Sequence, residues 1–405
     1  MTVTGGRSRL FTFTLLTTLY AAQGLPFGFF SQALPVFLRK QGHSLQVVGL
    51  SSLLAAPWAF KFFWAPLVDR YANQRFGRRR SWIIPLQLLS AGLLFVLGTF
   101  PQNGPLLALL VAVFLTNLFA ATQDIATDAL ALDLLPADQR GVANGIQVAG
   151  YRVGMILGGG AVLLVFEALG WAASFAAMGA VMVLLSVPVF WLKEPQHSHS
   201  HAPEQAGVLG GHFLRRSDAL PILALLVSYK FGDAFALSML RPLLVDRGKS
   251  LAEIGSLLGV YGFSAGLMGA LLGGACVNRL GRKRALLWFG ALQALSVAGY
   301  ALLARDVLPN VGLYALTVFE HLAGGMATAA LFTSMMDWCR RDHAATDYAV
   351  QASAVVIASA VAAAASGYSA HALGYELHFL LSALLALLVL GLVQVVFPRV
   401  AHKEA

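Results

Sequence analysis

About twelve stretches of this sequence are each long and apolar enough to cross a lipid bilayer. A spanning helix needs ~20 mostly apolar residues, because the hydrocarbon core is ~30 Å thick and each helical residue rises ~1.5 Å. The stretches run approximately over residues 10–38, 45–68, 82–100, 105–129, 141–165, 170–192, 218–241, 251–276, 285–304, 309–335, 347–370 and 376–398. Since backbone polar groups find no water inside a bilayer, we predict that each stretch is a helix of an all-α integral membrane protein.

The composition agrees with a membrane environment and excludes most soluble classes of protein. Of the 405 residues, 58% are hydrophobic and 12% are charged, whereas soluble domains carry roughly 25% charged residues. A soluble globule this apolar would expose patches that cause aggregation. We therefore exclude a soluble enzyme, a nucleic-acid-binding protein and a disordered chain, and we expect the lipid bilayer to surround the protein.

The basic residues predict the orientation of the chain in the membrane. Cytoplasmic loops of membrane proteins collect Lys and Arg. If the N-terminus is cytoplasmic, 19 of the 28 Lys and Arg residues fall in cytoplasmic segments and 5 fall in the opposite loops. We therefore predict that both ends of the chain lie on the cytoplasmic side.

The two halves of the sequence repeat each other. GRRR at 77–80 aligns with GRKR at 281–284, and the same shift of 204 residues carries Asp133 to Asp337. Six spans in each half keep both halves in the same orientation, as in transporters built from parallel repeats. We therefore predict three parts, a six-helix bundle over 1–192, a cytoplasmic linker over 193–217 and a second six-helix bundle over 218–405.

Ionisable residues inside the spans are the strongest indication of a functional site. A charged side chain at the bilayer centre costs at least ~2.5–3.5 kcal/mol, so it normally faces a polar cavity. Arg152 and Lys230 lie mid-span, and Asp124 and Asp128 share one helix face because they are four residues apart. A structural explanation stays open for each residue; Lys230 and Asp233, for example, can form a neutralised pair.

Glycines recur at intervals of four in the fifth span, at Gly150, Gly154 and Gly158. Small residues at this spacing let two helix backbones approach closely in lipid. The eighth span repeats the spacing at Gly262 and Gly266 and again at Gly269 and Gly273. Static close packing and a sliding interface between the fifth and eighth spans both remain open as explanations of this pattern.

Two loops resemble a family signature. APLVDRYANQRFGRRR (65–80) and GACVNRLGRKR (274–284) resemble the G-x-x-x-D-R-x-G-R-R signature of the major facilitator superfamily. The resemblance implies a cytoplasmic charge cluster that latches the two halves, and a bare positively charged loop is the alternative. Asn278 replaces the signature Asp in the second copy, so we expect the latch to be asymmetric, with the first copy contributing more to it. The candidate gate residues are Asp69, Arg70, Arg78, Arg79, Arg80, Arg279 and Arg282.

Further blocks resemble the muropeptide permease family, whose members import cell-wall fragments through the inner membrane. These blocks are KFFWAPLVDR (61–70), QDIATDALALDLLP (123–136), RGVANGIQVAGYRVGM (140–155), FEHLAGGMATAALFTSMMDWC (319–339) and ATDYAVQAS (345–353). The compact length and the first-span run YAAQGLPFGFFSQALPVFLR (20–39) look more similar to a sister branch of permeases for ferric siderophores.

The resemblance implies a transporter that imports a small molecule by alternating access, and we predict that protons drive it. We expect a ferric siderophore of the pyochelin or rhizobactin type as the substrate, with an anhydromuropeptide as the alternative. A polytopic membrane sensor or enzyme is the alternative of another class. We expect a monomer in a bacterial inner membrane, with no cofactor, no bound metal and no catalytic residues.

The polar residues of the spans are assigned to two roles. The candidate substrate-binding residues are Tyr20, Gln23, Gln147, Tyr151, Arg152, Tyr229, Lys230 and Glu320. Two of them, Arg152 and Lys230, are expected to hold an anionic group of the substrate. A carboxyl group removed from water binds a proton more readily, so the candidate proton-coupling residues are Asp124, Asp128, Asp233 and Glu320.

Overall fold

A computed structural model describes residues 9–71, 73, 76–101, 104–134, 140–192, 194, 211–339 and 344–401, and all regular secondary structure in these ranges is helical. Eight helices of the described chain are long and apolar enough to cross a membrane. Each of the twelve predicted stretches coincides with helix, whether in one continuous element or in several short ones. The prediction of an all-α membrane protein is therefore confirmed.

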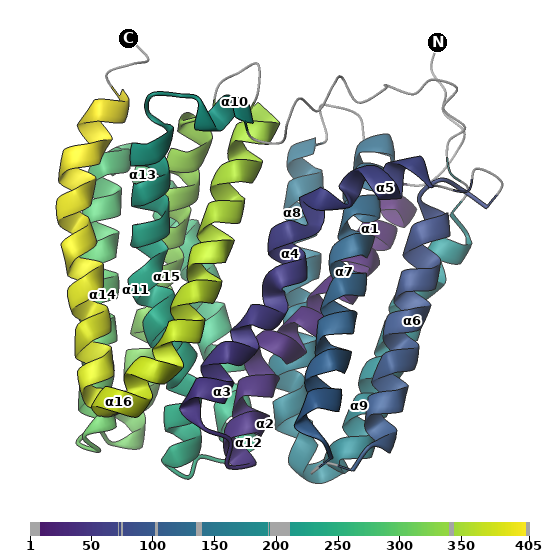
Figure 1. Cartoon of the computed structure of the whole chain (residues 1–405), viewed down its shortest axis with the longest axis horizontal. Helices are drawn as coiled ribbons and strands as arrows, with labels where there is room; N and C mark the ends of the chain where they lie inside the picture. The colour runs from purple at the N-terminus through teal and green to yellow at the C-terminus, as the bar shows by residue number, and fades with distance from the viewer. Residues whose placement is uncertain are drawn as a thin grey trace. The chain divides into compact units, whose positions relative to one another are not determined.

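The elements of the first half follow one another with few breaks (Figure 1). They are α1 (Arg9–Gly28), η1 (Phe29–Ala33), α2 (Leu34–Lys40), α3 (Leu45–Leu50), η2 (Ser51–Ala55), α4 (Ala56–Phe60), η3 (Lys61–Phe63), α5 (Ala65–Arg70), α6 (Arg80–Thr99), α7 (Leu106–Leu134), α8 (Arg140–Met155), η5 (Ile156–Ala161) and α9 (Val162–Phe190). The second half contains α10 (Gly211–Leu214), α11 (Ala219–Asp246), α12 (Leu251–Ile254), η6 (Gly255–Gly262), α13 (Phe263–Leu280), α14 (Arg282–Ala304), α15 (Asn310–Asp337) and α16 (Ala344–Ala401).

Two elements each contain two spans joined at a glycine. Gly170 in α9 has a φ of 73° and Gly374 in α16 has a φ of 76°. A positive φ is readily adopted by glycine because it has no Cβ. Figure 1 shows that α16 reverses its direction partway along its length. One element, α16, therefore covers both predicted stretches, 347–370 and 376–398.

The chain divides into two compact units, each with its own core. The first unit comprises Met1–Phe37, Leu54–His199 and Leu251–Gly255, and the second comprises Leu38–Leu53, Ser200–Ser250 and Ser256–Ala405. The first unit buries a cluster that includes Leu19, Ile83 and Val189, and the second buries one that includes Phe289 and Leu331. The boundaries of two six-helix bundles at 192 and 218 stay a prediction.

The glycine pattern of the fifth span lies against α1 inside the first unit. A Cβ added to Gly154 would meet the carbonyl oxygen of Ala21 at 2.1 Å, and one added to Gly158 would meet that of Leu25 at 1.8 Å. The same closeness is found from the α1 side: a Cβ added to Gly24 would lie 2.0 Å from the carbonyl oxygen of Tyr151 on α8. The glycines therefore permit a close backbone contact between α1 and the helix formed by α8 and η5.

Candidate functional site

A buried acidic cluster forms on α7 in the first unit. The ammonium of Lys61, from η3, pairs with the carboxylate of Asp124, which is 6% exposed. One helical turn further on, Asp128 Oδ1 accepts hydrogen bonds from the Tyr20 hydroxyl at 3.0 Å and from Gln147 Nε2 at 3.1 Å. The structure therefore brings four predicted site residues together from α1, α7 and α8, and adds a lysine.

Aromatic side chains pack beside this acidic cluster. The rings of Phe27, Trp58 and Tyr151 contact one another with centroid separations of 5.7, 5.7 and 6.0 Å. Trp58 Nε1 donates a hydrogen bond to Asn117 Oδ1 at 3.1 Å, and Lys61 Nζ lies 5.8 Å from the centroid of the Trp58 ring. We call Phe27, Trp58 and Tyr151 the aromatic cluster; it contains the predicted substrate-binding residue Tyr151.

Two other predicted binding residues of the first unit have different surroundings. Gln23 is fully buried on α1, and neither polar atom of its side-chain amide has a hydrogen-bond partner among the described residues. Buried amides normally have such partners, so Gln23 is an exception, and its role in substrate binding stays a prediction. Arg152 lies on α8 with intermediate exposure.

The second unit contains a buried lysine–aspartate pair on α11. Lys230 Nζ lies 2.5 Å from Asp233 Oδ2 and donates a weaker hydrogen bond to Thr328 Oγ1 of α15 at 3.3 Å. The side chains of the pair are 14% and 10% exposed. Tyr229, the adjacent predicted binding residue, instead donates its hydroxyl proton to the backbone carbonyl of Leu286 at 2.8 Å. Its hydroxyl therefore joins α11 to α14.

Glu320 lies in a separate polar cluster of the second unit. It is 1% exposed on α15, and its Oε2 lies 2.8 Å from Nδ1 of His321 and 3.5 Å from the Tyr300 hydroxyl. The His321 ring also packs over Gly262, where an added Cβ would lie 2.7 Å from Nε2. The roles of Glu320 in substrate binding and proton coupling stay predictions.

The internal repeat places these two lysine–aspartate pairs at different positions. Lys230 follows Gln23 by 207 residues, and Thr328 follows Asp124 by 204 residues. In the first unit the acid of the pair, Asp124, lies on α7. In the second unit the position equivalent to Asp124 is a threonine, Thr328, and the acid of the pair, Asp233, lies on α11 beside its lysine. Each unit thus holds one buried lysine–aspartate pair built from a different set of helices.

Two of the predicted gate residues form ion pairs with acids of their own unit. Arg79 Nε lies 3.4 Å from Asp133 in the first unit, and Arg282 Nε lies 2.6 Å from Asp337 in the second. These two acids are the repeat-related pair noted in the sequence. Arg78 and Arg279 are exposed, and Arg80 is partly buried. The side chains of Asp69 and Arg70 lie outside the described residues, so the gate role stays a prediction.

Glu194 stabilises the start of α6. Its carboxylate accepts hydrogen bonds from the backbone N–H groups of Arg79 and Arg80 at 2.6–3.1 Å. A carboxylate at this position satisfies unpaired donors of the first helical turn and interacts favourably with the helix dipole. Glu194 was not predicted as a functional residue, because a single acidic residue in a polar segment does not indicate any particular role.

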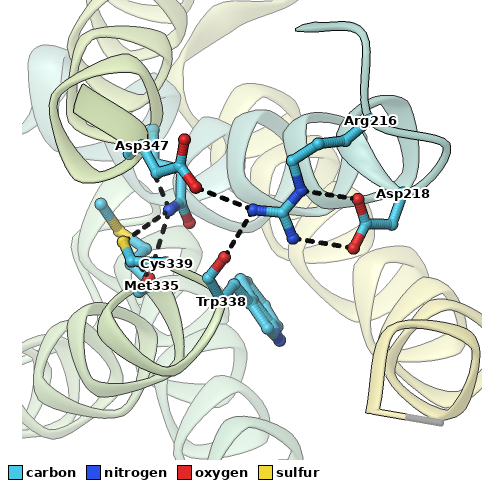
Figure 2. A network of polar contacts seen from close by, with 7 residues as sticks. Arg216, Asp218, Met335, Trp338, Cys339 and Asp347 are labelled. Atoms are coloured by element: carbon cyan, nitrogen blue, oxygen red, sulfur yellow. Dashed lines mark hydrogen bonds and ion pairs between the residues drawn. The ribbon is translucent and has the colours of Figure 1, made fainter. Parts of the chain in front are cut away.

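Arg216 joins three segments of the second unit, as Figure 2 shows. Its guanidinium makes two 2.8 Å hydrogen bonds to Asp218, one of 3.0 Å to Asp347 and one of 2.8 Å to the carbonyl of Trp338. The hydrogen bonds to Asp218 raise the pKa of Arg216 above its ordinary value, so the guanidinium stays charged at any physiological pH. Asp347 is fully buried.

A second set of contacts extends this network into α15. Gln351 Nε2 donates to the carbonyl of Met335 at 3.2 Å and to Sγ of Cys339 at 3.3 Å. Burial raises the pKa of the Cys339 thiol, which keeps it protonated. Arg216 and Asp347 were not selected from the sequence, since charges outside the spans or at their ends are common.

Replacing Arg216 with alanine is expected to destabilise the second unit. Removing one partner of a buried ion pair typically costs ~3–5 kcal/mol, and this change also removes the hydrogen bonds from Arg216 to Asp218 and to the carbonyl of Trp338. Thermal unfolding of the purified protein in detergent measures the effect. Arg215→Ala, which removes an exposed neighbour, is the control and should leave the melting temperature unchanged. Equal melting temperatures for the two variants would contradict the assigned role of Arg216.

Comparisons with known proteins identify the family of this chain. The model of the Major Facilitator Superfamily matches residues 16–307 and 230–405. The anhydromuropeptide permease of Escherichia coli (strain K12) is 36% identical over 342 residues, which cover 83% of this chain and 70% of that protein. The putative transporter AmpG 4 of Rickettsia conorii is 27% identical, with 82% of this chain and 83% of that protein covered.

Solved structures support the fold. The bacterial homologue of the human lysosomal transporter Spinster, in an inward-facing and unoccupied conformation, matches with a TM-score of 0.72 at 16% identity, covering 98% of each chain. At this level of identity the likeness concerns the arrangement of the helices alone.

Proposed function

The chain belongs to the Major Facilitator Superfamily, and we propose that it imports anhydromuropeptides across the bacterial inner membrane together with protons. It is a multi-pass membrane protein and a secondary transporter, not an enzyme. The observation that carries the choice of substrate is the 36% identity to an anhydromuropeptide permease over 83% of the chain. The sequence analysis put a ferric siderophore first; the relatives reported above favour its alternative.

The buried polar groups support such a substrate. A muropeptide combines sugar rings and hydroxyl groups with the carboxylates of a short peptide. The aromatic cluster offers ring faces for stacking, Gln23 offers an amide, and Arg152 and Lys230 offer positive charge for carboxylates. The acidic residues Asp124, Asp128, Asp233 and Glu320 are proposed to carry the protons.

An uptake assay in proteoliposomes tests this function. Purified protein is reconstituted, and labelled anhydromuropeptide or labelled ferric pyochelin-type siderophore is supplied with and without an inward proton gradient. We expect anhydromuropeptide to accumulate above its external concentration only with the gradient, while the siderophore stays at the level of protein-free liposomes. Accumulation of the siderophore alone would overturn the substrate. Equal muropeptide uptake with and without the gradient would overturn proton coupling.

A further inference from the structure

We propose that Lys61 is a substrate-binding residue that exchanges its partner during transport, from the carboxylate of Asp124 to a carboxylate of the substrate. Lys61 would thereby link substrate binding to protonation of Asp124 and Asp128. The inference rests on the function proposed above and adds a residue that neither the sequence analysis nor the comparisons assign.

The position of Lys61 suits such an exchange. It lies in η3, the single turn between α4 and α5, so its long side chain reaches the α7 acids from a neighbouring segment. The Lys61 side chain is 33% exposed, whereas that of its partner Asp124 is 8% exposed. The lysine is therefore the accessible member of the pair. An ammonium on a four-carbon stem can reorient without a change of the backbone.

The aromatic cluster lies next to the same ammonium. Lys61 Nζ is 5.8 Å from the centroid of the Trp58 ring, a distance at which the ring face attracts a cation by ~0.5–2 kcal/mol. The hydrogen bond from Trp58 to Asn117 holds the indole in place. A substrate whose sugar ring stacks on the aromatic cluster would thus bring its neighbouring carboxylate close to Lys61.

The charges around Lys61 connect this exchange to protons. The titratable groups that interact with it or with its partner are Asp124 and Asp128 on α7, Tyr20 on α1 and Tyr151 on α8. Lys61 contacts Asp124 directly, and Asp128 lies one helical turn further along α7, so one lysine stands beside two carboxylates. When a substrate carboxylate takes Lys61, these acids lose that counter-charge, and a proton can replace it. Substrate and proton then bind together, as symport requires.

A comparison of two probes and three variants tests the proposal. The probes are labelled anhydromuropeptide, which carries peptide carboxylates, and the labelled anhydro-disaccharide without its peptide, with its lactyl carboxyl group converted to the amide so that no carboxylate remains. The variants are Lys61→Met, Lys61→Arg and the control Lys40→Met, which removes an exposed lysine. Counterflow into proteoliposomes, which needs no proton gradient, gives KM for each probe, and its dependence on pH is measured for the anhydromuropeptide.

For Lys61→Met we expect KM for the anhydromuropeptide to rise more than ~10-fold, equivalent to ~1.4 kcal/mol, and to lose its dependence on pH. KM for the disaccharide should stay within ~2-fold of the unmodified protein, a difference well below ~1 kcal/mol. Lys61→Arg should restore most of the affinity because it keeps the charge, and Lys40→Met should change neither KM.

The outcomes separate this inference from the proposed function. If Lys61→Met weakens both probes equally, Lys61 only supports the structure and the proposal is wrong. Should Lys61→Met fold poorly because Asp124 is left unpaired, the neutral double variant Lys61→Met/Asp124→Asn replaces it and must show the same selective loss. If the unmodified protein transports neither probe, the proposed function itself fails and the inference falls with it.

Discussion

Replacing Lys230 with methionine is expected to abolish substrate uptake. The ammonium of Lys230 is bound by Asp233 and Thr328 in the second unit, and a charge this deep in a span is normally functional. Asp233 Oδ1 has no hydrogen-bond partner among the described residues, so the pair retains capacity to bind a further group. We expect proton-driven uptake in proteoliposomes to fall more than ~10-fold, equivalent to ~1.4 kcal/mol.

A double variant distinguishes function from simple charge neutralisation. Lys230→Met leaves the buried Asp233 unpaired and should lower stability, whereas Lys230→Met/Asp233→Asn removes both charges and should recover the folded yield. We expect the double variant to remain inactive, because the positive charge for the substrate is still absent. If it transports normally, Lys230 and Asp233 form only a neutralised pair. Lys40→Met is the control for loss of an exposed lysine.

Replacing Gly158 with leucine is expected to prevent the first unit from folding. Even the Cβ would lie 1.8 Å from the carbonyl oxygen of Leu25 and 2.7 Å from its carbonyl carbon. Overpacking in a core typically costs ~1–3 kcal/mol, and here the obstacle is backbone, which cannot rotate away as a side chain can. Size-exclusion chromatography of the detergent-solubilised protein should show loss of the monodisperse peak.

A glycine in open surroundings provides the control. Nothing lies within 4 Å of a Cβ added to Gly92 on α6, so Gly92→Leu should keep the peak and the melting temperature. Equal behaviour of the two variants would contradict close packing between α1 and the glycine face. Static close packing, one explanation left open by the sequence, predicts the difference.

The membrane helices could be predicted from the sequence because each depends on a local property, the length of an apolar run. The reversal at Gly374 falls in the predicted gap between residues 370 and 376, and the one at Gly170 falls at the first residue of the predicted stretch 170–192. The paired acids of α7 were also predictable, since residues four apart share a helix face whatever surrounds the helix. Asp133 and Asp337 followed from the repeat, and each binds an arginine of its own unit.

The partners of the site residues could not be predicted in this way. Lys61 lies 63 positions from Asp124, and Tyr20 lies 108 positions from Asp128, so their meeting depends on how whole helices pack. Tyr229 illustrates the opposite outcome: it neighbours Lys230 in sequence, yet its hydroxyl bonds to the backbone of α14. Adjacent residues on a helix point in different directions, and only the packed helices decide what each one meets.

The sequence by itself therefore determined the helical membrane fold, the internal repeat and the residues that carry charge into the spans. The pair of Lys230 and Asp233, three residues apart on one helix, was also open to prediction from the sequence. Only the tertiary structure decided that Lys61 neutralises Asp124 beside an aromatic cluster. The physical reason is the distance along the chain over which each effect acts. Hydrophobic length and helical periodicity depend on a few turns of one helix, whereas an ion pair between residues far apart in sequence forms only where packing brings the two side chains within ~4 Å.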